Sequence, residues 1–308
     1  MDQRLIELIK ETIKTGTVLE KELLKNHTTF RIGGEADYFL IPGSIKEAEE
    51  LLRLLCMYKE PFVVLGNGSN VLVSDKGIRG IVVCFSKGMD EILCDGNIIT
   101  AGAGAMLSKV AKCALDNCLT GMEFASGIPG SLGGAVYMNA GAYGGEMKDV
   151  ITKVILFDAE SREIVTLAGE DMCFAYRHSI AKEKPLFILE VQMELIKGDA
   201  NQIKFLMDDL NGRRRDKQPL EYPSAGSTFK RPEGYFAGKL IEDAGLKGYS
   251  VGGAQVSEKH CGFVINRGSA TAGEVLMLIK NVQEKVYEKF NVVLEPEVIM
   301  LGEEINGN

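Results

Sequence analysis

Several features that mark common classes of protein are missing from this chain of 308 residues. Its seven cysteines form no CxxC pair, and its three histidines lack the spacing of metal ligands, so no metal site is expected. An odd number of cysteines without such spacing is typical of reduced thiols in a cytoplasmic protein. No apolar run approaches the ~20 residues that cross a bilayer. The charged, amphipathic start MDQRLIELIKETIK does not have the pattern of a signal peptide. The sequence therefore predicts neither export nor insertion into a membrane.

An excess of positive charge is also absent. The formal net charge is −8, and binding along nucleic acid needs a positive surface, so nucleic acid is not an expected partner. A local basic patch can still hold a small anion. Hydrophobic residues make up 45% and charged residues 25%, which is ordinary for a globular protein. A chain of this length suits two or three packed units with well-buried cores.

Glycine, by contrast, is abundant and clustered, with 35 residues in the chain. The first cluster consists of Leu65, Gly66, Asn67, Gly68, Ser69 and Asn70. It joins two predicted strands and lacks the third glycine and the following helix of a dinucleotide fingerprint, and it has no GK[ST] of a P-loop. Two interpretations remain: a nest of backbone N–H groups that holds a pyrophosphate, or a plain hairpin turn marked by Asn-Gly.

The second cluster has seven glycines within the nineteen residues 127–145. Each glycine loses more entropy on ordering than alanine, so such a segment is a poor way to build a core. A ligand that passes against the backbone would offset this cost. The alternative, a flexible surface loop, is disfavoured because the intervening residues are mostly apolar.

The periodicity of apolar residues predicts an α+β fold in two regions without an internal repeat. A capping box of Ser44 and Glu47 opens the second of the expected helices. Helices are expected at 3–14, 45–59, 106–118, about 203–215, 236–245 and 271–290. Strands are expected at 61–65, 71–74, 80–85, 154–157, 163–167 (a hairpin with the preceding strand), 186–195, 249–256 and 260–265. The polar stretch 197–202 is the best candidate for a domain boundary.

Six segments of the chain occur in an order that closely resembles the MurB family of UDP-N-acetylenolpyruvoylglucosamine reductases. They are NHTTFRIGG (26–34), VLGNGSN (64–70), GIPGSLGGAVYMNAGAYG (127–144), YRHS (176–179), PSAGSTFKRP (223–232) and EPEV (295–298). The resemblance implies an FAD-binding region of the vanillyl-alcohol-oxidase (PCMH) type, followed by an α+β substrate-binding domain. The expected division is an N-terminal helix and lead-in at 1–25, the FAD region at 26–198 and the substrate domain at 199–308, whose last strand returns toward the flavin.

The resemblance also implies which residues hold the cofactor, a non-covalent FAD. The two glycine clusters would bind its pyrophosphate and line the isoalloxazine. The residues are Leu65, Gly66, Asn67, Gly68, Ser69, Asn70, Gly127, Ile128, Pro129, Gly130, Ser131, Gly133, Gly134, Asn139, Gly141 and Ala142.

The implied reaction is the NADPH-dependent reduction of a UDP-sugar enolpyruvyl ether to UDP-N-acetylmuramate in peptidoglycan synthesis, as a UDP-N-acetylmuramate dehydrogenase. Hydride from flavin N5 adds to the terminal vinyl carbon, and negative charge then develops toward the carboxylate. Arg177 can stabilise this charge, since guanidinium stays charged and grips carboxylates. Glu297 would have to carry or share a proton, which burial of a carboxyl favours. By resemblance, Ser227 donates the final proton.

The ordinary alternatives for these residues are a surface salt bridge for Arg177, a charge at a strand edge for Glu297 and a backbone-bonded turn hydroxyl for Ser227. For the substrate, the resemblance suggests contacts with Lys217, Tyr176, Gln255, Lys259 and Asn266. Lys217 stands in the basic run 213–217, which at a helix end can equally be solvated. His178 is expected to orient the arginine, and His260 to be structural.

Longer members of the family insert a segment, with a closing tyrosine, between the YR and SAGS motifs. Only 49 residues separate Arg177 from Ser227, so the chain resembles the shorter type. No separate dinucleotide motif is present, so NADPH and the UDP-sugar are expected to use one site in turn, in a monomeric enzyme. The competing hypotheses are a flavin oxidase on the same fold and a non-catalytic nucleotide-sugar-binding protein.

Overall fold

The computed structural model describes residues 2–303, which form two compact units built from separate segments of the chain. The first unit contains the chain up to residue 20, residues 38–67 and residues 80–213. The second contains residues 21–37, residues 68–79 and the chain from residue 214 onward. Among the described residues, no helix combines the length and the apolar character needed to cross a membrane.

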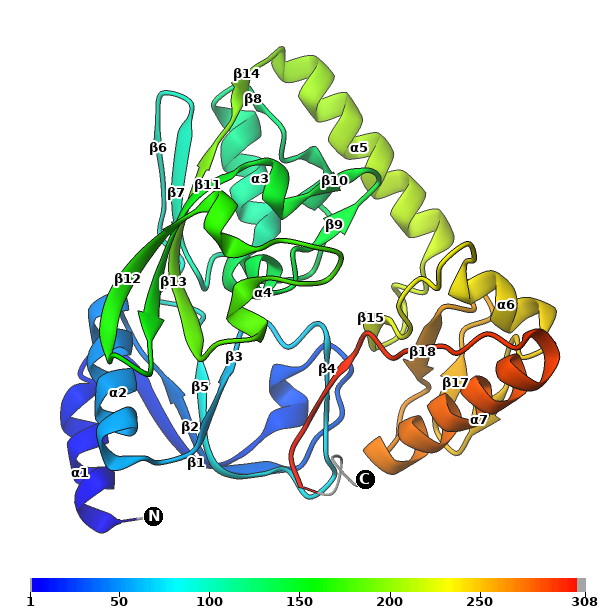
Figure 1. Cartoon of the computed structure of the whole chain (residues 1–308), viewed down its shortest axis with the longest axis horizontal. Helices are drawn as coiled ribbons and strands as arrows, with labels where there is room; N and C mark the ends of the chain where they lie inside the picture. Colours follow the sequence, from blue (N-terminus) through cyan, green and yellow to red (C-terminus); the bar gives the residue numbers. More distant parts are fainter. Residues whose placement is uncertain (1, 304–308) are drawn as a thin grey trace. The chain divides into compact units, whose positions relative to one another are not determined.

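The first unit is built around an antiparallel five-stranded sheet in the order β12-β11-β13-β7-β6 (Figure 1). Helices α3 and α4 pack on it, and their apolar sides join its buried residues in one core. The strands are β6 Ile92–Asp95, β7 Ile98–Gly102, β11 Ile151–Asp158, β12 Glu163–Ala168 and β13 Leu186–Glu194, and the helices are α3 Leu107–Asp116 and α4 Leu132–Tyr137.

A second sheet of the chain has four strands in the order β1-β2-β5-β3. The chain passes from one unit to the other within three of them, β1, β2 and β5. In the first unit, β3 pairs in parallel with β5, and helices α1 and α2 contact each other. The elements are α1 Gln3–Thr12, β1 Thr17–Leu23, β2 Glu35–Ile41, α2 Ile45–Tyr58, β3 Phe62–Leu65 and β5 Ile78–Cys84.

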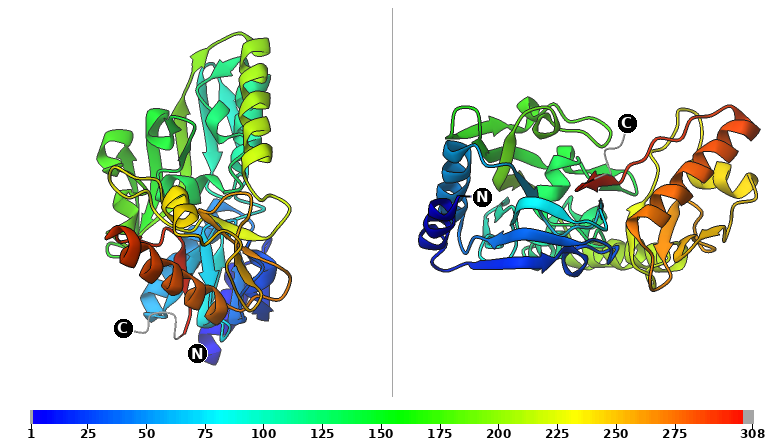
Figure 2. Two further views of the ribbon diagram at one scale, coloured as in Figure 1. Left: turned by 90° about the vertical axis from the view of Figure 1, so that its right-hand side faces the viewer. Right: turned by 90° about the horizontal axis from the view of Figure 1, so that it is seen from below.

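The second unit has an antiparallel sheet in the order β15-β18-β17-β16, and helix α7 lies along it (Figure 2). Strand β19, near the end of the described chain, pairs in parallel with β4, from residues 71–73. The elements are η1 Leu24–His27, β4 Val71–Val73, β15 Ser224–Ser227, α6 Ala237–Asp243, β16 Ser250–Val251, β17 Ala254–Val256, β18 Phe263–Asn266, α7 Ala272–Phe290 and β19 Ile299–Leu301.

The remaining elements are short, apart from the helix that connects the units. They are β8 Leu119–Thr120, η2 Glu123–Ala125, β9 Gly141–Ala142, β10 Gly145–Glu146, η3 Met147–Asp149, η4 Gly169–Met172, η5 Ile180–Lys182 and β14 Ile196–Lys197, with the long helix α5 at Ala200–Lys217. Helix α5 contains the last crossing of the chain between the units, after Arg213.

Most predicted elements are confirmed, including the hairpin of β11 and β12. One expectation was wrong. The segment 249–256 is two strands, because Gly252 has a φ of +53° and turns the chain between β16 and β17. The second glycine cluster contains a short helix, α4, that was not predicted, and Gly133 in it packs so closely on Ala103 that a Cβ would approach Ala103 Cβ to 2.8 Å.

The structure also excludes the hairpin interpretation of the first glycine cluster. Strand β3 before the cluster pairs with β5, whereas β4 after it pairs with β19. The two strands belong to different sheets, so residues 66–70 do not close a hairpin.

The predicted capping box at Ser44 is half formed. Ser44 Oγ accepts a hydrogen bond from the Glu47 N–H, but the Glu47 carboxylate accepts bonds from the Gly43, Lys14 and Thr15 N–H groups and from Thr15 Oγ1. Burial alone raises the pKa of Glu47, and these hydrogen bonds more than offset that effect, so the pKa is lowered. Glu47 therefore ties the end of α1 to the start of α2.

Replacing Glu47 with alanine is expected to lower the free energy of unfolding at pH 7 by about 2–3 kcal/mol, because several donors lose a charged acceptor. Since the folded-state pKa is depressed, this contribution is present above the ordinary pKa of glutamate, about 4.3, and is lost as the pH falls through the folded-state value. Urea unfolding of both proteins between pH 7 and pH 3 measures the difference. Glu50→Ala, at an exposed position of the same helix, is the control, and a Glu47→Ala effect that does not shrink at low pH contradicts the assignment.

Candidate active site

The structure brings the two glycine clusters together within the first unit. Asn67 Nδ2 donates a hydrogen bond of 2.6 Å to the Pro129 carbonyl. A Cβ on Gly66 would lie 2.2 Å from Ser131 Oγ, so a larger residue here would force the Ser131 hydroxyl to move. The predicted cofactor residues Gly66, Asn67, Pro129 and Ser131 thus lie side by side.

A segment that the sequence analysis did not single out holds the second cluster in place. The Leu132 and Gly133 N–H groups donate to the Ala105 and Ala103 carbonyls, and the Leu107 N–H donates to Gly130. Residues 101–105 read AGAGA, so another run of small residues was the available signal. This segment fixes the backbone that would face a ligand.

The side chain of Ser131 fits an anionic or polar ligand at this place. Ser131 as a whole is only 3% exposed, and among the described residues its Oγ makes no hydrogen bond. The Oγ atom itself is not fully buried, so a ligand can reach it. Gly134 is open, since a Cβ there would meet only Ser131 Oγ, at 3.4 Å. A donor without a partner beside open backbone suits the phosphate and ring edge of a flavin nucleotide.

The thiol beside the first glycine cluster, Cys84, is poorly suited to covalent attachment of a flavin. Cys84 lies beside the first cluster, with Sγ 3.8 Å from the Gly66 carbonyl oxygen. Burial raises the pKa of the Cys84 thiol to about 11. The group is therefore a neutral and weakly nucleophilic thiol at physiological pH.

The other predicted cofactor residues lie in both units. Leu65 ends β3 in the first unit, and Gly127, Ile128 and Gly141 and Ala142 of β9 belong to the same unit. Gly68, Ser69 and Asn70 belong to the second unit, where the Gly68 carbonyl accepts from Thr29 N. Asn139 is 1% exposed, and its side chain bonds Ala175, Glu146 and Lys148.

Arg177 occupies a tight turn in the first unit. The Ala175 and His178 backbones exchange two hydrogen bonds of 3.2 Å, and Arg177 between them has a φ of +55°. Its guanidinium lies over the ring of the exposed Tyr176, 5.1 Å from the centroid. His178 Nε2 lies 3.2 Å from Glu183 Oε1, and the role of His178 in orienting Arg177 stays a prediction. A non-glycine residue held at positive φ is often found at a functional site.

In the second unit, a backbone hydrogen bond joins the segment of Ser227 to that of Glu297. Ser227 ends β15, after a bulge at Gly226 with a φ of +74°. The buried Thr228 links them, since the Glu297 N–H donates to the Thr228 carbonyl at 2.8 Å. Among the described residues Ser227 Oγ makes no hydrogen bond, so the backbone-bonded turn hydroxyl considered for Ser227 is not observed. Asn70 Nδ2 donates to the Glu297 carbonyl, so a residue of the first glycine cluster contacts the acidic motif.

The five predicted substrate residues fall into two groups. Tyr176 and Lys217, at the end of α5, are exposed. Gln255 Nε2 donates to Gly248, Lys259 Nζ donates to the Arg215 carbonyl at 2.6 Å, and Asn266 bonds the Phe30 carbonyl and two loop N–H groups. The side chains of the second group stabilise the unit itself, and their role with the substrate stays a prediction.

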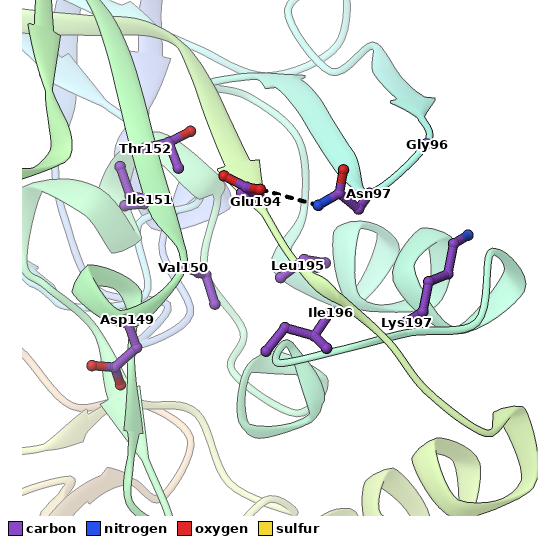
Figure 3. A pocket seen from close by; sticks show the side chains of 10 residues that line it. All are labelled: Gly96, Asn97, Asp149, Val150, Ile151, Thr152, Glu194, Leu195, Ile196 and Lys197. Atoms are coloured by element: carbon purple, nitrogen blue, oxygen red, sulfur yellow. Dashed lines mark hydrogen bonds between the residues drawn. The ribbon is translucent and has the colours of Figure 1, made fainter.

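A hollow of about 730 Å³ lies elsewhere on the first unit (Figure 3). Asp149, Glu194 and Lys197 stand among its lining residues, and Glu194 accepts a bond from Asn97. None of the predicted site residues lines it. The structure therefore gives no reason to move the candidate site there.

Comparison with known proteins decides the family. A model described as the FAD binding domain matches residues 36–167, and one described as the C-terminal domain of UDP-N-acetylenolpyruvoylglucosamine reductase matches residues 218–301. A reductase of that name from Caldanaerobacter subterraneus subsp. tengcongensis is 54% identical over 98% of this chain and 100% of its own. The chain belongs to the MurB family of UDP-N-acetylenolpyruvoylglucosamine reductases.

Further relatives support this assignment. The reductase from Agathobacter rectalis is 52% identical over 98% of this chain and 100% of its own. The crystal structure of MurB from Thermus caldophilus has a TM-score of 0.79 and 33% identity, and the match covers 92% of this chain and 98% of that chain. The α+β fold with a PCMH-type FAD-binding region and a MurB C-terminal domain is confirmed, and the enzyme is a flavin-dependent oxidoreductase.

The approach of Gly66 to Ser131 predicts a specific defect. Gly66→Ala is expected to weaken FAD binding by at least about 10-fold, since a methyl group that displaces Ser131 disturbs the packed cradle. Titration of apoprotein with FAD, followed by fluorescence quenching, measures the change. Gly273→Ala is the matched control, because its Cβ would meet atoms no closer than 3.9 Å. Equal FAD affinity in Gly66→Ala and wild-type protein refutes the placement of the flavin at this junction.

Proposed function

We propose that the enzyme reduces the enolpyruvyl C=C bond of UDP-N-acetyl-3-O-(1-carboxyvinyl)-glucosamine, giving UDP-N-acetylmuramate for peptidoglycan, with NADPH as the source of electrons. The observation that carries this proposal is the 54% identity with a reductase of this name over 98% of the chain, in which the two glycine clusters meet at Ser131 and Ser227 lies beside the Glu297 motif. A flavin reductase needs one place for the nucleotide and one proton donor for the product.

Once reduced by NADPH, a flavin held here would supply the hydride. Gly66, Asn67 and Ser131 would hold the nucleotide in place at the junction of the two glycine clusters. We expect this binding to be non-covalent, in keeping with the raised pKa of the Cys84 thiol.

The three reacting residues divide the remaining work. Arg177 binds the substrate carboxylate through two parallel donors and opposes the negative charge that develops there. Glu297, holding or sharing a proton, donates a hydrogen bond to the same developing charge. Ser227 Oγ then delivers a proton to the carbon next to the carboxylate, which is a favourable transfer to a carbanion-like centre.

The same assignment indicates the oligomeric state, the location and the partners of the enzyme. We infer a monomeric, cytoplasmic enzyme that binds NADPH and the UDP-sugar in turn at one site, without nucleic acid or membrane as a partner. Lys217 and Tyr176, both exposed, are the best candidates to contact the diphosphate and sugar. The net charge of −8 makes a local basic side chain necessary for an anionic substrate.

The test is an anaerobic titration of photoreduced, bleached holoenzyme. Addition of the enolpyruvyl ether is expected to restore the yellow absorbance, with one equivalent of product formed per flavin. UDP-N-acetylglucosamine, which lacks the vinyl group, is the control and should leave the protein bleached. Colour that returns only on admission of oxygen would instead support a flavin oxidase, and apoprotein that never takes up FAD would support a binding protein.

A further inference from the structure

We propose that Asn139 is a positioning residue for Arg177: its side chain fixes the turn that presents the guanidinium, and it does not touch the cofactor. The inference rests on the proposed role of Arg177. It changes the function expected for the Asn139 side chain, which the resemblance placed against the flavin.

The hydrogen bonds of Asn139 leave its amide with no N–H donor to spare for a ligand. Its Nδ2 donates to Glu146 Oε2 at 2.9 Å and to the Ala175 carbonyl at 3.0 Å. Its Oδ1 accepts from the Lys148 N–H at 3.0 Å. An amide has two N–H donors, and both are used here. The residue is 1% exposed, so these bonds form away from solvent.

The acceptor at Ala175 belongs to the turn that holds Arg177. The Ala175 carbonyl also accepts from the His178 N–H and so closes the turn. A second tie holds the other end, where Ser179 Oγ, in a fully buried residue, donates to the Tyr137 carbonyl at 2.8 Å. Both ties run to residues 137–139, at the end of α4 in the second glycine cluster.

The turn needs such support because its backbone is strained. Arg177 has a φ of +55°, a conformation that costs a residue with a side chain about 1 kcal/mol or more. A free segment would relax and move the guanidinium. The two ties hold the arginine in register with the backbone that is expected to bind the flavin. A substrate carboxylate gripped by Arg177 is then kept at a fixed position relative to the reacting ring.

Asn139 itself has a φ of +43°, so the substitutions that test its side chain must tolerate this backbone conformation. Asn139→Gly removes the amide and keeps the backbone conformation accessible, since glycine adopts positive φ without strain. Asn139→Asp keeps the shape but loses both donors and places a second carboxylate beside Glu146. Both variants are expected to slow oxidation of the reduced enzyme by the enolpyruvyl substrate by about 10- to 100-fold, the usual cost of a displaced catalytic group. Reduction of the enzyme by NADPH and the affinity for FAD should stay within about 2-fold of wild type, because one misplaced side chain is the only change.

The deciding experiment is a double-mutant cycle with Arg177→Ala, read by stopped-flow absorbance of each half-reaction. If Asn139 acts through Arg177, Asn139→Gly has no further effect once the guanidinium is gone. The inference would be overturned if the two substitutions slowed substrate reduction independently, so that their effects multiplied in the double mutant. A slower reduction by NADPH or a loss of FAD in the Asn139 variants would also overturn it. A wild-type rate of substrate reduction in Arg177→Ala alone would overturn the role of Arg177 itself, and the inference with it.

Two further variants complete the design. Asn97→Ala removes a hydrogen-bonded amide from the same unit, at the turn before β7, and should leave both half-reactions unchanged. Ser179→Ala cuts the other tie of the turn and should reproduce the pattern of Asn139→Gly. If both Asn139 variants fail to fold, a Ser179→Ala enzyme with wild-type substrate reduction overturns the proposal that these ties position Arg177.

Discussion

The Ser227→Ala enzyme is expected to be reduced by NADPH at a near-wild-type rate and to reduce the enolpyruvyl substrate roughly 10²–10⁴ times more slowly, the usual contribution of a positioned acid. The two half-reactions separate because only the second consumes a proton at carbon. Substrate affinity should change little, since one neutral hydroxyl contributes about 0.5–1.5 kcal/mol net. Ser227 Oγ makes no hydrogen bond to the described residues, so its removal should not weaken the fold.

Stopped-flow absorbance of each half-reaction measures both rates. Ser227→Cys should recover part of the activity, because a thiol can also donate a proton. Ser250→Ala is the matched control, since Ser250 lies in the same sheet and bonds only the Gly248 carbonyl through its side chain. Equal slowing of both half-reactions in Ser227→Ala would show that Ser227 shapes the flavin site, and the proton must then come from another group.

Arg177→Ala is expected to lower the rate of substrate reduction by about 10²–10³, the effect of removing one group that stabilises developing charge. The KM for the enolpyruvyl substrate should also rise, because the same guanidinium binds the carboxylate in the ground state. Arg177→Lys should recover little, since an ammonium cannot offer two parallel donors. Flavin reduction by NADPH is the internal reference for folding.

The backbone strain at Arg177 calls for a control that shares it. Arg162, in the turn between β11 and β12, has a φ of +61° and lies in the same unit. Arg162→Ala therefore tests the effect of alanine at positive φ without touching the site. If the two variants lose the same activity, the loss reflects strain, and Arg177 does not bind the carboxylate.

The local elements could be predicted from the sequence because local periodicity and glycine encode them. The valine-rich runs became β3, β4 and β5, and the helix at 271–290 is α7 within one residue of the expected start. The capping box at Ser44 shows the limit. Its nearby bond to the Glu47 N–H was foreseeable, but the bonds of the carboxylate to Lys14 and Thr15 span more than thirty residues.

The division of the chain was harder to foresee. A composition change near 197–202 marks the start of α5, close to the last crossing after Arg213. The crossings after residues 20, 37, 67 and 79 lie within strands and a loop, where composition does not change. The predicted domains 1–25, 26–198 and 199–308 stay a functional prediction that the compact units do not test.

In the candidate site, the sequence motifs identify the residues but not their hydrogen-bond partners. The motifs named the glycines, Arg177, Ser227 and Glu297, but their hydrogen-bond partners are set by tertiary structure. The contact of Asn67 with Pro129 and that of Asn139 with Ala175 join segments 62 and 36 residues apart. No periodicity or composition signal encodes such pairs, so a side chain assigned to the cofactor can prove to hold a turn.

The pairing of β19 with β4 has a consequence for how the enzyme is made on the ribosome. Strand β4 is synthesised early, yet its partner is Ile299–Leu301, and the Ile299 N–H donates to the carbonyl of Asn70 just before β4. Strand β4 therefore lacks its strand partner while more than two hundred further residues emerge. A nascent or truncated chain that stops before Glu297 lacks both the acidic residue proposed for the site and the strand that pairs with β4. Activity should thus appear only after nearly all the chain has left the exit tunnel, and the exposed strand is where chaperones would be needed before then.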